Sequence, residues 1–349
     1  MHHTLPGFAR MRQRLSGALS ALALLAVPAG AALAQGGPVT VRFQDYPGFG
    51  NLLVHVAIAK GYCEQNGLKC EVTNIASSPL GIQAVMAGSV DSAFAAVDAV
   101  NSAILRGVKL KYVTGANTAN VLELVAGNDV PTPNADKGWP AFMQDFKGKK
   151  IGVTGRGAPV ERYMDWMLKK AGMDPEADVT YVAVGPPTTG YAALASNQVD
   201  ALITYEPVGS ICKIEKTCKL VWRASTDKQP AEMYALNGAG PGNVFLQDFI
   251  DRNPKVVDAV IRALTQADAF ANDPAHFDEV LAISRRYFEL KMPHGDEIMR
   301  ASLHAQLDTN TFRVHMDRKA MKAALDMLVE TGQLTKTVPV SDMVLDRTP

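Results

Sequence analysis

The sequence lacks an excess of charge of either sign. It has 35 lysines and arginines and 35 aspartates and glutamates in 349 residues. Residues 1–34 contain three arginines and no acidic residue, so residues 35–349 have a net charge of 32 − 35 = −3. Nucleic acids and anionic lipid surfaces attract strongly basic proteins. The charge balance therefore argues against a nucleic-acid partner.

Long apolar runs are also missing, except near the N-terminus. There, three arginines between residues 10 and 14 precede an apolar run at 15–33, which ends in Ala-Leu-Ala before Gln35. This is the pattern of a secretory signal peptide, with cleavage expected after Ala34. No later segment approaches ~18 consecutive apolar residues, the length that a membrane span requires. We expect a mature chain of 349 − 34 = 315 residues, exported to the periplasm and long enough for two domains.

Recognisable catalytic and metal-binding signatures are absent. The sequence has no HExxH or GxSxG motif, the patterns of zinc peptidases and serine hydrolases. The histidines after residue 34 are scattered: His55, His276, His294, His304 and His315. We therefore expect no enzymatic activity, no cofactor and no bound metal. An exported enzyme with a convergent acid, base or nucleophile set is the rival hypothesis.

Cysteine is scarce, and its four copies form two local pairs, Cys63 with Cys70 and Cys212 with Cys218. Export places these residues in an oxidising compartment. Two short-loop disulfides are the simplest interpretation. A shared metal site is the alternative, although neither a CxxC spacing nor a neighbouring histidine favours it.

What the chain does contain is an alternation of short apolar runs and amphipathic segments. This alternation is typical of α/β domains with parallel sheets and crossover helices. In a first series we expect strands at 39–44, 70–75, 91–95 and 109–114, and helices at 51–60 and 78–88. Ser78 and Asp98 are the predicted N-caps of two helices.

A second series begins after a polar, proline-rich stretch at 130–139. Its expected strands are 150–153, 179–184 and 200–204, and its first helix is 159–171. The two series share a short echo, AGSVDSAFAAVDAV at 87–100 and ASNQVDALITYEPV at 195–208. In both copies a helix ends and Val-Asp enters a strand. The echo falls at the same place in the two series.

From Leu246 onward the pattern is helical, with amphipathic runs at 254–272, 276–288, 295–307 and 318–331. A helical tail of this length usually packs on an existing domain, so residues 237–243 are predicted to be a return crossing. The resulting prediction is a first lobe from 35–130 and 240–349, a second lobe from 131–239, and a hinge of two crossings near 130–140 and 232–243.

In doubly wound domains, ligands bind at the loops that follow the carboxyl ends of the strands. Aromatic side chains there can pack on a ligand, and polar groups can fix its orientation. The predicted contacts in the first lobe are Tyr46, Phe49, Gly50, Asn51, Ser77, Ser78, Val97, Asp98 and Asn117. Those in the second lobe are Arg156, Gly157, Ala158, Pro186, Thr188, Tyr205 and Glu206.

The loop TGRGAP at 154–159 raises the question of a phosphate site, because glycine-rich turns before helices bind phosphate. The loop lacks the Gly-Lys-Ser/Thr of a P-loop, and its glycines do not have the GxGxxG spacing. A helix N-terminus beside Arg156 instead suits a carboxylate or sulfonate. The alternative is that Arg156 is a solvated residue that pairs with Glu161.

Several stretches stand in a specific order and spacing: GFGNLLVHVAIAKGYCEQNGLKCEV, GIQAVMAGSVDSAF, FKGKKIGV, ALASNQVDALITYEP and the helical tail after NVFLQDFIDRNP. In this order they resemble the solute-binding proteins of ABC importers, in the branch of nitrate-, sulfonate- and taurine-binding proteins and thiamine-precursor binders. The resemblance implies an α/β, bilobed Venus-flytrap fold of two doubly wound domains with a helical C-terminal segment. It also implies an ABC permease in the inner membrane as the partner.

The loops and the resemblance together predict a monomeric periplasmic protein that captures a small organic anion between its lobes. We expect a sulfonate or carboxylate with an aromatic or apolar body. The alternative is a pyrimidine, a thiamine-precursor-like compound or a cationic solute, for which Asp98 and Glu206 become the leading contacts. A related fold also serves an enzyme of pyrimidine synthesis, but that enzyme's cysteine-rich signature is absent here.

Overall fold

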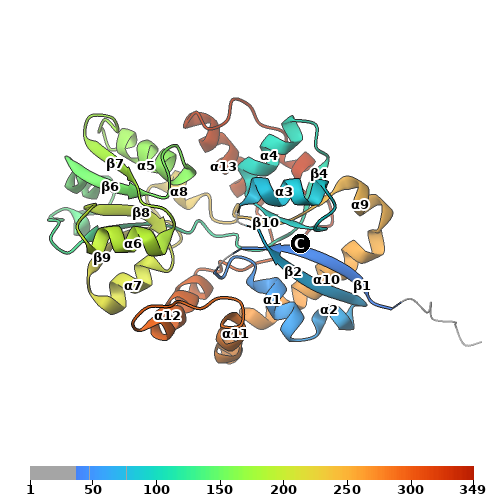
Figure 1. Cartoon of the computed structure of the whole chain (residues 1–349). Coiled ribbons are helices and arrows are strands. Elements are labelled where there is room, and N and C mark those ends of the chain that lie inside the picture. Colours follow the sequence, from blue (N-terminus) through green and yellow to red (C-terminus); the bar gives the residue numbers. More distant parts are fainter. Residues whose placement is uncertain (1–36, 47, 76) are drawn as a thin grey trace, which may run out of the picture. The chain divides into compact units, whose positions relative to one another are not determined.

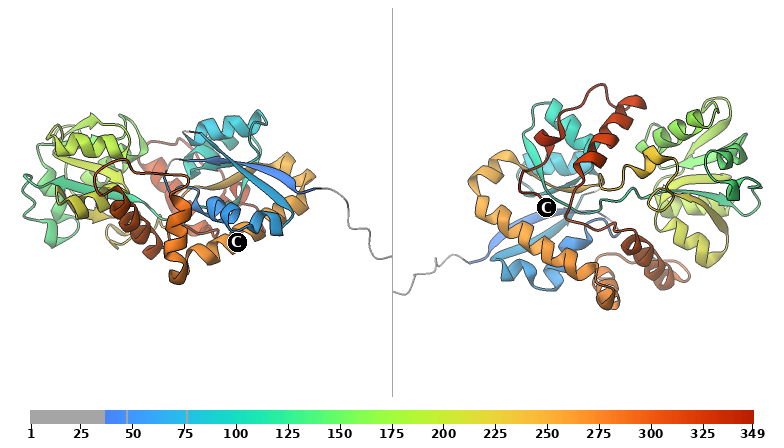
Figure 2. Two further views of the ribbon diagram at one scale, coloured as in Figure 1. Left: turned by 60° about the horizontal axis from the view of Figure 1, so that its bottom comes forward. Right: turned by 180° about the vertical axis from the view of Figure 1, so that it is seen from behind.

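The computed structural model describes residues 37–46, 48–75 and 77–349 (Figures 1 and 2). Residues 38–349 form one compact unit. The predicted signal peptide and its cleavage site lie outside the described residues. Among the described residues, no helix is long and apolar enough to cross a membrane.

The strands of the structure alternate with helices through the first two thirds of the chain, as predicted. The strands are β1 (Val39–Asp45), β2 (Leu68–Asn74), β3 (Ala93–Ala95), β4 (Leu110–Gly115), β5 (Leu122–Gly127), β6 (Lys149–Val153), β7 (Val179–Ala183), β8 (Ala201–Tyr205), β9 (Cys218–Arg223) and β10 (Gly242–Leu246).

The helices of the first two thirds of the chain lie mostly between consecutive strands. They are α1 (Leu52–Ala59), α2 (Tyr62–Gln65), α3 (Ser78–Met86), α4 (Val97–Leu105), α5 (Pro159–Lys170), α6 (Pro187–Ala195), α7 (Val208–Glu215) and α8 (Ala231–Tyr234), with short 3-10 turns at Ala135–Lys137 and Ala141–Phe146.

The predicted helical tail is confirmed, with bounds close to those expected. It contains α9 (Gln247–Arg252), α10 (Pro254–Ala271), α11 (Phe277–Ser284), α12 (Gly295–Asp308), α13 (Arg318–Glu330) and α14 (Val340–Met343), with a 3-10 turn at Pro274–His276. Helix α10 packs on α1 and helix α13 on α4, so these parts of the tail cover the first series, whereas α12 packs on α7 of the second series (Figure 1).

The two series form sheets of corresponding strand order. In the first, β1 pairs with β2, β3-β10-β4 form a second group, and a parallel bridge from Phe43 to Ser92 connects β1 to the start of β3. The second series forms one sheet in the order β7-β6-β8-β5-β9. In the first series, β10 lies between β3 and β4 and is antiparallel to both. In the second series, β5 lies between β8 and β9 and is antiparallel to both.

The expectation of purely parallel sheets is therefore wrong at these strands. Strands β5, β9 and β10 were not predicted. Six consecutive buried residues in β5 give no alternation of apolar and polar side chains to indicate a strand. The α/β fold class and the strands β1 to β4 and β6 to β8 are confirmed.

The chain passes between the sheets twice, at 116–121 and at 224–241, and the two passages lie side by side. The amide N–H groups of Gly238 and Gly240 donate to the Thr118 carbonyl at 2.8 and 3.0 Å. A Cβ at Gly240 would lie 2.0 Å from the Asn117 carbonyl oxygen. Glycine is therefore required where the two backbones approach this closely.

Sheet membership suggests lobe limits that differ from the predicted ones. The sequence placed the first crossing near 130–140, but β5 is already hydrogen-bonded to β8 and β9. We propose that the second lobe extends from 122 to 223 and that the first lobe comprises 38–115 and 242–349.

The sequence echo has a structural counterpart. Asp91 enters β3 and its carboxylate accepts the backbone N–H of Arg42 on β1 at 2.8 Å. Asp200 enters β8 and its carboxylate accepts the backbone N–H of Lys150 on β6 at 2.7 Å. The repeated Val-Asp pair thus ties the start of the third strand of each sheet to the strand beside it.

Two predicted helix caps are corrected. Helix α3 is capped by Ser77, whose Oγ accepts the Leu80 N–H at 3.4 Å, while the Ser78 hydroxyl accepts the Ala96 N–H at 3.1 Å. Helix α4 has Ala96 at its N-cap and Asp98 in its first turn. Adjacent polar residues made the choice ambiguous, because Ser77 and Ser78 are equally good caps by residue type.

The cysteines form the two predicted disulfides, Cys63–Cys70 and Cys212–Cys218. The first joins α2 to β2, and the second joins α7 to β9. The alternative of a shared metal site finds no support among the described residues, which contain no cluster of potential metal ligands.

Each disulfide should stabilise the fold by restricting the unfolded chain. Loops closed over separations of 7 and 6 residues correspond to about 2 to 3 kcal/mol each in the chain-entropy model. Replacing Cys212 and Cys218 together by serine should lower the free energy of unfolding by about this amount, measured by urea denaturation. Unmodified thiols in the non-reduced wild-type protein, detected by mass spectrometry, would contradict the assignment.

Candidate functional site

The structure brings Tyr46 and Tyr205, predicted contacts from the two series, next to each other. Tyr46 follows β1 and stacks on Phe94, with ring centroids 6.0 Å apart. Burial and then the neighbouring Tyr46 hydroxyl raise the pKa of Tyr205 well above its ordinary value. Two half-buried tyrosine side chains, one just after β1 and one at the end of β8, therefore lie close to each other.

The glycine-rich loop before α5 is occupied by a carboxylate of the chain itself. Glu161, buried on α5, accepts the Gly157 N–H at 2.7 Å and lies 3.3 Å from Nε of Arg156. The guanidinium also lies over the Tyr181 ring, at 5.6 Å. The alternative stated above, in which Arg156 pairs with Glu161, is therefore the arrangement that the structure has.

Other predicted contacts in this region lie at the starts of helices, with Thr188 in the first turn of α6. Ala158 precedes α5 as its N-cap, and Pro186 precedes α6 in the same way. Pro186 and Thr188 are exposed.

Some predicted contacts lie in the interior and hold the loops in place. Asn51 is fully buried, and its Nδ2 donates to the Gln44 carbonyl at 2.9 Å and to Asn243 Oδ1 at 3.2 Å. Phe49 is buried and packs edge-to-face on Phe288. Asn51 thus connects β1 to β10. Gly50 packs against Tyr46.

Asp98 is half-buried in the first turn of α4, beside the buried Val97. Burial raises the pKa of its carboxyl group, against a lowering by backbone N–H groups of its own turn. Its charge also contributes to the raised pKa of Tyr163 on α5, so Asp98 faces the second series. Among residues 37–349 apart from 47 and 76, no cation pairs with it.

Asn117 lies on the first passage between the sheets. Its backbone N–H donates to the Pro241 carbonyl at 3.1 Å. Its Oδ1 is buried and accepts no hydrogen bond from the described part of the chain.

Glu206 belongs to a buried ionic network that the sequence did not predict. Nη2 of Arg223 lies 2.7 Å from Glu206 Oε1 and 2.6 Å from Glu123 Oε1. Glu123 also accepts the Gly209 N–H at 2.9 Å, and Glu206 accepts the Ser210 hydroxyl at 3.0 Å. We call Glu123, Arg223 and Glu206 the hinge triad, because Glu123 follows the first passage and Arg223 precedes the second.

The hinge triad has one cation for two carboxylates. Burial, and then the Glu206 carboxylate, raise the pKa of Glu123 to about 8, against the lowering effect of Arg223. At neutral pH the two carboxyl groups therefore hold about one proton between them. The hinge triad is then close to electrically neutral.

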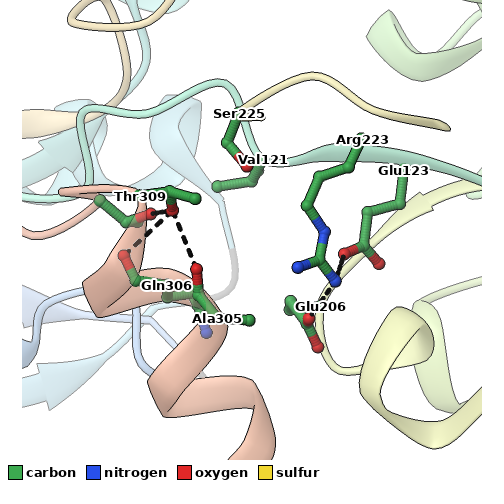
Figure 3. A pocket seen from close by; sticks show the side chains of 9 residues that line it. Val121, Glu123, Glu206, Arg223, Ser225, Ala305, Gln306 and Thr309 are labelled. Carbon is green, nitrogen blue, oxygen red and sulfur yellow. Dashed lines mark hydrogen bonds and ion pairs between the residues drawn. The ribbon is translucent and has the colours of Figure 1, made fainter. Parts of the chain in front are cut away.

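A pocket opens beside the hinge triad (Figure 3). It is small: its volume is about 10 Å³, which is room for about one water molecule. Arg223 reaches into this space from β9, and Gln306 and Thr309 of α12 lie across from it. The remaining lining residues are Val121, Glu123, Glu206, Ser225, Ala305 and Thr311.

The sequence carried one signal for this site. Glu123 stands within the apolar run LELVAG, and a charged residue in a buried strand is rare unless it is paired. The partner could not be identified, because Arg223 is 100 residues away along the chain and the β5–β9 register alone places it opposite Glu123.

The hinge triad leaves no room for a side chain at position 209. A Cβ there would lie 2.7 Å from both Arg223 Nη2 and Glu123 Oε1. Gly209→Ala should therefore lower the free energy of unfolding by about 1 to 3 kcal/mol, measured by urea denaturation. Gly155→Ala is the matched control, because no atom lies within 4 Å of its Cβ position. Equal stability of the two variants would contradict the packing seen here.

The raised pKa of Glu123 predicts a pH dependence of stability. Because the folded-state pKa of about 8 exceeds the ordinary 4.5, the folded protein binds the extra proton, and stability falls as pH rises between these values. Glu123→Gln removes this contribution, so wild type should lose more unfolding free energy than E123Q between pH 5.5 and 8.5. Denaturant titrations at both pH values measure the difference, and parallel losses would contradict the assignment.

Comparisons with known proteins agree with this architecture. A protein of Brucella abortus (strain 2308), named as a candidate binding protein, is 26% identical over 299 residues, which are 84% of this chain and 86% of that protein. The fold is similar to that of the periplasmic aliphatic sulphonate binding protein SsuA from Escherichia coli, with a TM-score of 0.66, 16% identity, and coverage of 89% of this chain and 93% of that one.

A second solved structure, the alkanesulfonate-binding protein SsuA from Xanthomonas axonopodis pv. citri bound to MOPS, gives a TM-score of 0.63, 19% identity, and coverage of 89% of this chain and 99% of that one. These likenesses confirm the bilobed periplasmic-binding-protein fold. The model of the NMT1-like family matches residues 50–284, more than half of the sequence. The chain therefore belongs to the NMT1-like family.

Proposed function

We propose that this protein is the substrate-binding component of an ABC importer, which captures a small organic solute between its two lobes and delivers it to a permease of the inner membrane. The observation that carries the proposal is the proximity of Tyr46, which follows β1, and Tyr205, the last residue of β8, at the carboxyl ends of strands in different sheets. Ligands of open α/β sheets bind at such strand ends. The family and the fold neighbours support a binding role.

Capture follows from the arrangement of the loops. A solute that contacts both Tyr46 and Tyr205 gains its full set of contacts only when the two lobes are closed. Its binding energy therefore shifts the population toward the closed state. The two passages between the sheets run side by side and supply the hinge for this motion.

An anionic solute, a sulfonate or carboxylate, is the preferred class. The names of two fold neighbours describe sulfonate binding. The aromatic pair Tyr46 and Tyr205 offers surfaces on which an apolar or aromatic body can pack.

The alternative solute is a pyrimidine or a cation, and one observation favours it. Asp98 is a half-buried carboxylate that faces Tyr163 and has no cation partner in the described part of the chain. A protonated amine of a ligand would supply the positive charge and the hydrogen-bond donors that the Asp98 carboxylate lacks.

A thermal-shift screen of the mature protein tests the proposal. The solutes are methanesulfonate, benzoate, nitrate, an aminopyrimidine and spermidine. A hundredfold excess over Kd should add about 2.7 kcal/mol to the free energy of unfolding, which raises Tm by several degrees. Tyr46→Ala and Tyr205→Ala should each weaken the response, and the exposed Tyr234→Ala is the matched control. No response to any solute would refute the proposal.

Uptake of the identified solute by intact cells tests the transport role. Cells without this protein should accumulate less of the solute at low external concentration, and the protein supplied in trans should restore uptake. Binding without any effect on uptake would instead indicate a receptor partner.

A further inference from the structure

Gln44 is a buried amide that joins three segments of the first lobe. It lies on β1, two residues before Tyr46, and is fully buried. Its side-chain Nε2 donates to the Ile75 carbonyl at 2.9 Å and to the Ser77 carbonyl at 3.1 Å. Its Oε1 accepts the Phe94 N–H at 2.9 Å. One side chain thus ties β1 to the residues that follow β2 and to β3.

The backbone of Gln44 makes two further ties in the same region. Its N–H donates to the Ser92 carbonyl at 2.8 Å, and its carbonyl accepts Nδ2 of Asn51 at 2.9 Å. A buried polar network whose members are paired makes its surroundings rigid. Gln44 therefore fixes the end of β1 relative to β3 and to the residue that precedes α1.

The segments that Gln44 joins carry contacts predicted for the solute. The Tyr46 ring stacks on Phe94 at 6.0 Å, so Gln44 holds the chain next to one ring and the backbone of the other. Ser77 caps α3, and the Ser78 hydroxyl accepts the Ala96 N–H at 3.1 Å. Gln44 thus lies beneath the residues that the solute is expected to contact.

The fold makes room for this amide at Gly81, the fourth residue of α3. A Cβ there would overlap the Gln44 amide oxygen and lie 2.5 Å from Cδ. Glycine is less favourable than alanine within a helix, so this glycine has a packing reason. The fourth residue of α6 is also a glycine, Gly190, but its Cβ would lie 3.4 Å or more from the side chains of Val184 and Leu202.

We propose that Gln44 is the positioning residue of the first-lobe half of the solute site. It holds Tyr46, Phe94 and the start of α3 in the arrangement that the solute contacts. This inference rests on the proposed function and deepens it. Segments that are held before the solute arrives do not have to be ordered by it, so less binding energy is lost to ordering. A variant that releases them should bind more weakly while it is still folded.

A purely stabilising role predicts a different result, because such an amide can be replaced without effect on Kd as long as the variant is folded. The chain offers an amide for comparison. Asn101 on α4 is fully buried, its Nδ2 donates to the Lys336 carbonyl at 3.2 Å, and its Oδ1 accepts the Val338 N–H at 2.9 Å. Its partners follow α13 and are not predicted solute contacts.

Gln44→Met and Asn101→Leu are the matched pair of variants. Each replaces a buried amide by an apolar side chain of similar size, and each should lower Tm because the former partners are left unpaired. The probe is methanesulfonate, benzoate, nitrate, the aminopyrimidine or spermidine, whichever binds the wild type tightest. Its Kd should rise about 10-fold or more in Q44M and stay at the wild-type value in N101L.

Isothermal titration calorimetry measures Kd at a temperature at which circular dichroism shows all three proteins to be folded. Equal Kd values in Q44M and the wild type overturn the proposal.

Gly81→Ala reaches the same amide from the neighbouring helix. The new methyl group displaces the Gln44 side chain, so Kd should rise as in Q44M. Gly190→Ala adds the same methyl group to α6 without such an overlap and should bind like the wild type. If Q44M does not fold, G81A decides, and a wild-type Kd in folded G81A overturns the proposal.

Combining Gln44→Ala with Gly81→Ala separates stability from positioning. The small side chain at position 44 leaves space for the methyl group at position 81, so the double variant should have a higher Tm than G81A. The ties to Ile75, Ser77 and Phe94 remain absent, so Kd should stay raised. Recovery of the wild-type Kd together with Tm would show that Gln44 only stabilises the fold, and the positioning role would be refuted.

The thermal-shift screen separates this inference from the proposed function. If the wild type binds one of the five solutes and Q44M binds it equally well, the solute-binding function stands and the positioning role fails. If none of the five solutes binds the wild type, the proposed function fails and the positioning role fails with it.

Discussion

The constraint on which the structure depends is the exchange of strands between the two sheets. Strand β10 completes the first sheet after the chain has built the second, and β5 begins in the second directly after β4. Both passages meet at Thr118, whose carbonyl accepts two N–H groups of the returning chain. Because no side chain fits at Gly240, the two backbones can run in contact. Each sheet is therefore complete only when both passages are in place.

The hinge triad is a consequence of this exchange. The antiparallel register of β5 and β9 puts Glu123 opposite Arg223, at the points where the chain enters and leaves the second sheet. Burying two carboxylates with one guanidinium is expensive unless hydrogen bonds compensate it. The N–H of Gly209 and the hydroxyl of Ser210, both at the start of α7, supply part of this compensation. Through Glu206, the network ties the residue after Tyr205 to the strands on which the two passages end and begin.

The two arginines near the predicted loops illustrate how tertiary structure decides the role of a charge. Arg156 stands in a loop whose composition suits an anion, but Glu161, in the first turn of the following helix, already fills that place. Arg223 ends an ordinary strand, and its two carboxylates contact only one of its nitrogen atoms. In both cases the fold brings a carboxylate of the chain itself to the guanidinium.

The sequence by itself determined the α/β class, the parallel strands, the helical tail, the two disulfides and the loops where the sheets present their carboxyl ends. These features depend on residues close together in the chain, such as the Val-Asp pairs that open β3 and β8. Only the tertiary structure decided the antiparallel strands β5 and β10, the pairing of Arg156 and the hinge triad. The physical reason is that a strand buried on both faces carries no periodic pattern, and that an ion pair across 100 residues depends on a register that no local preference specifies.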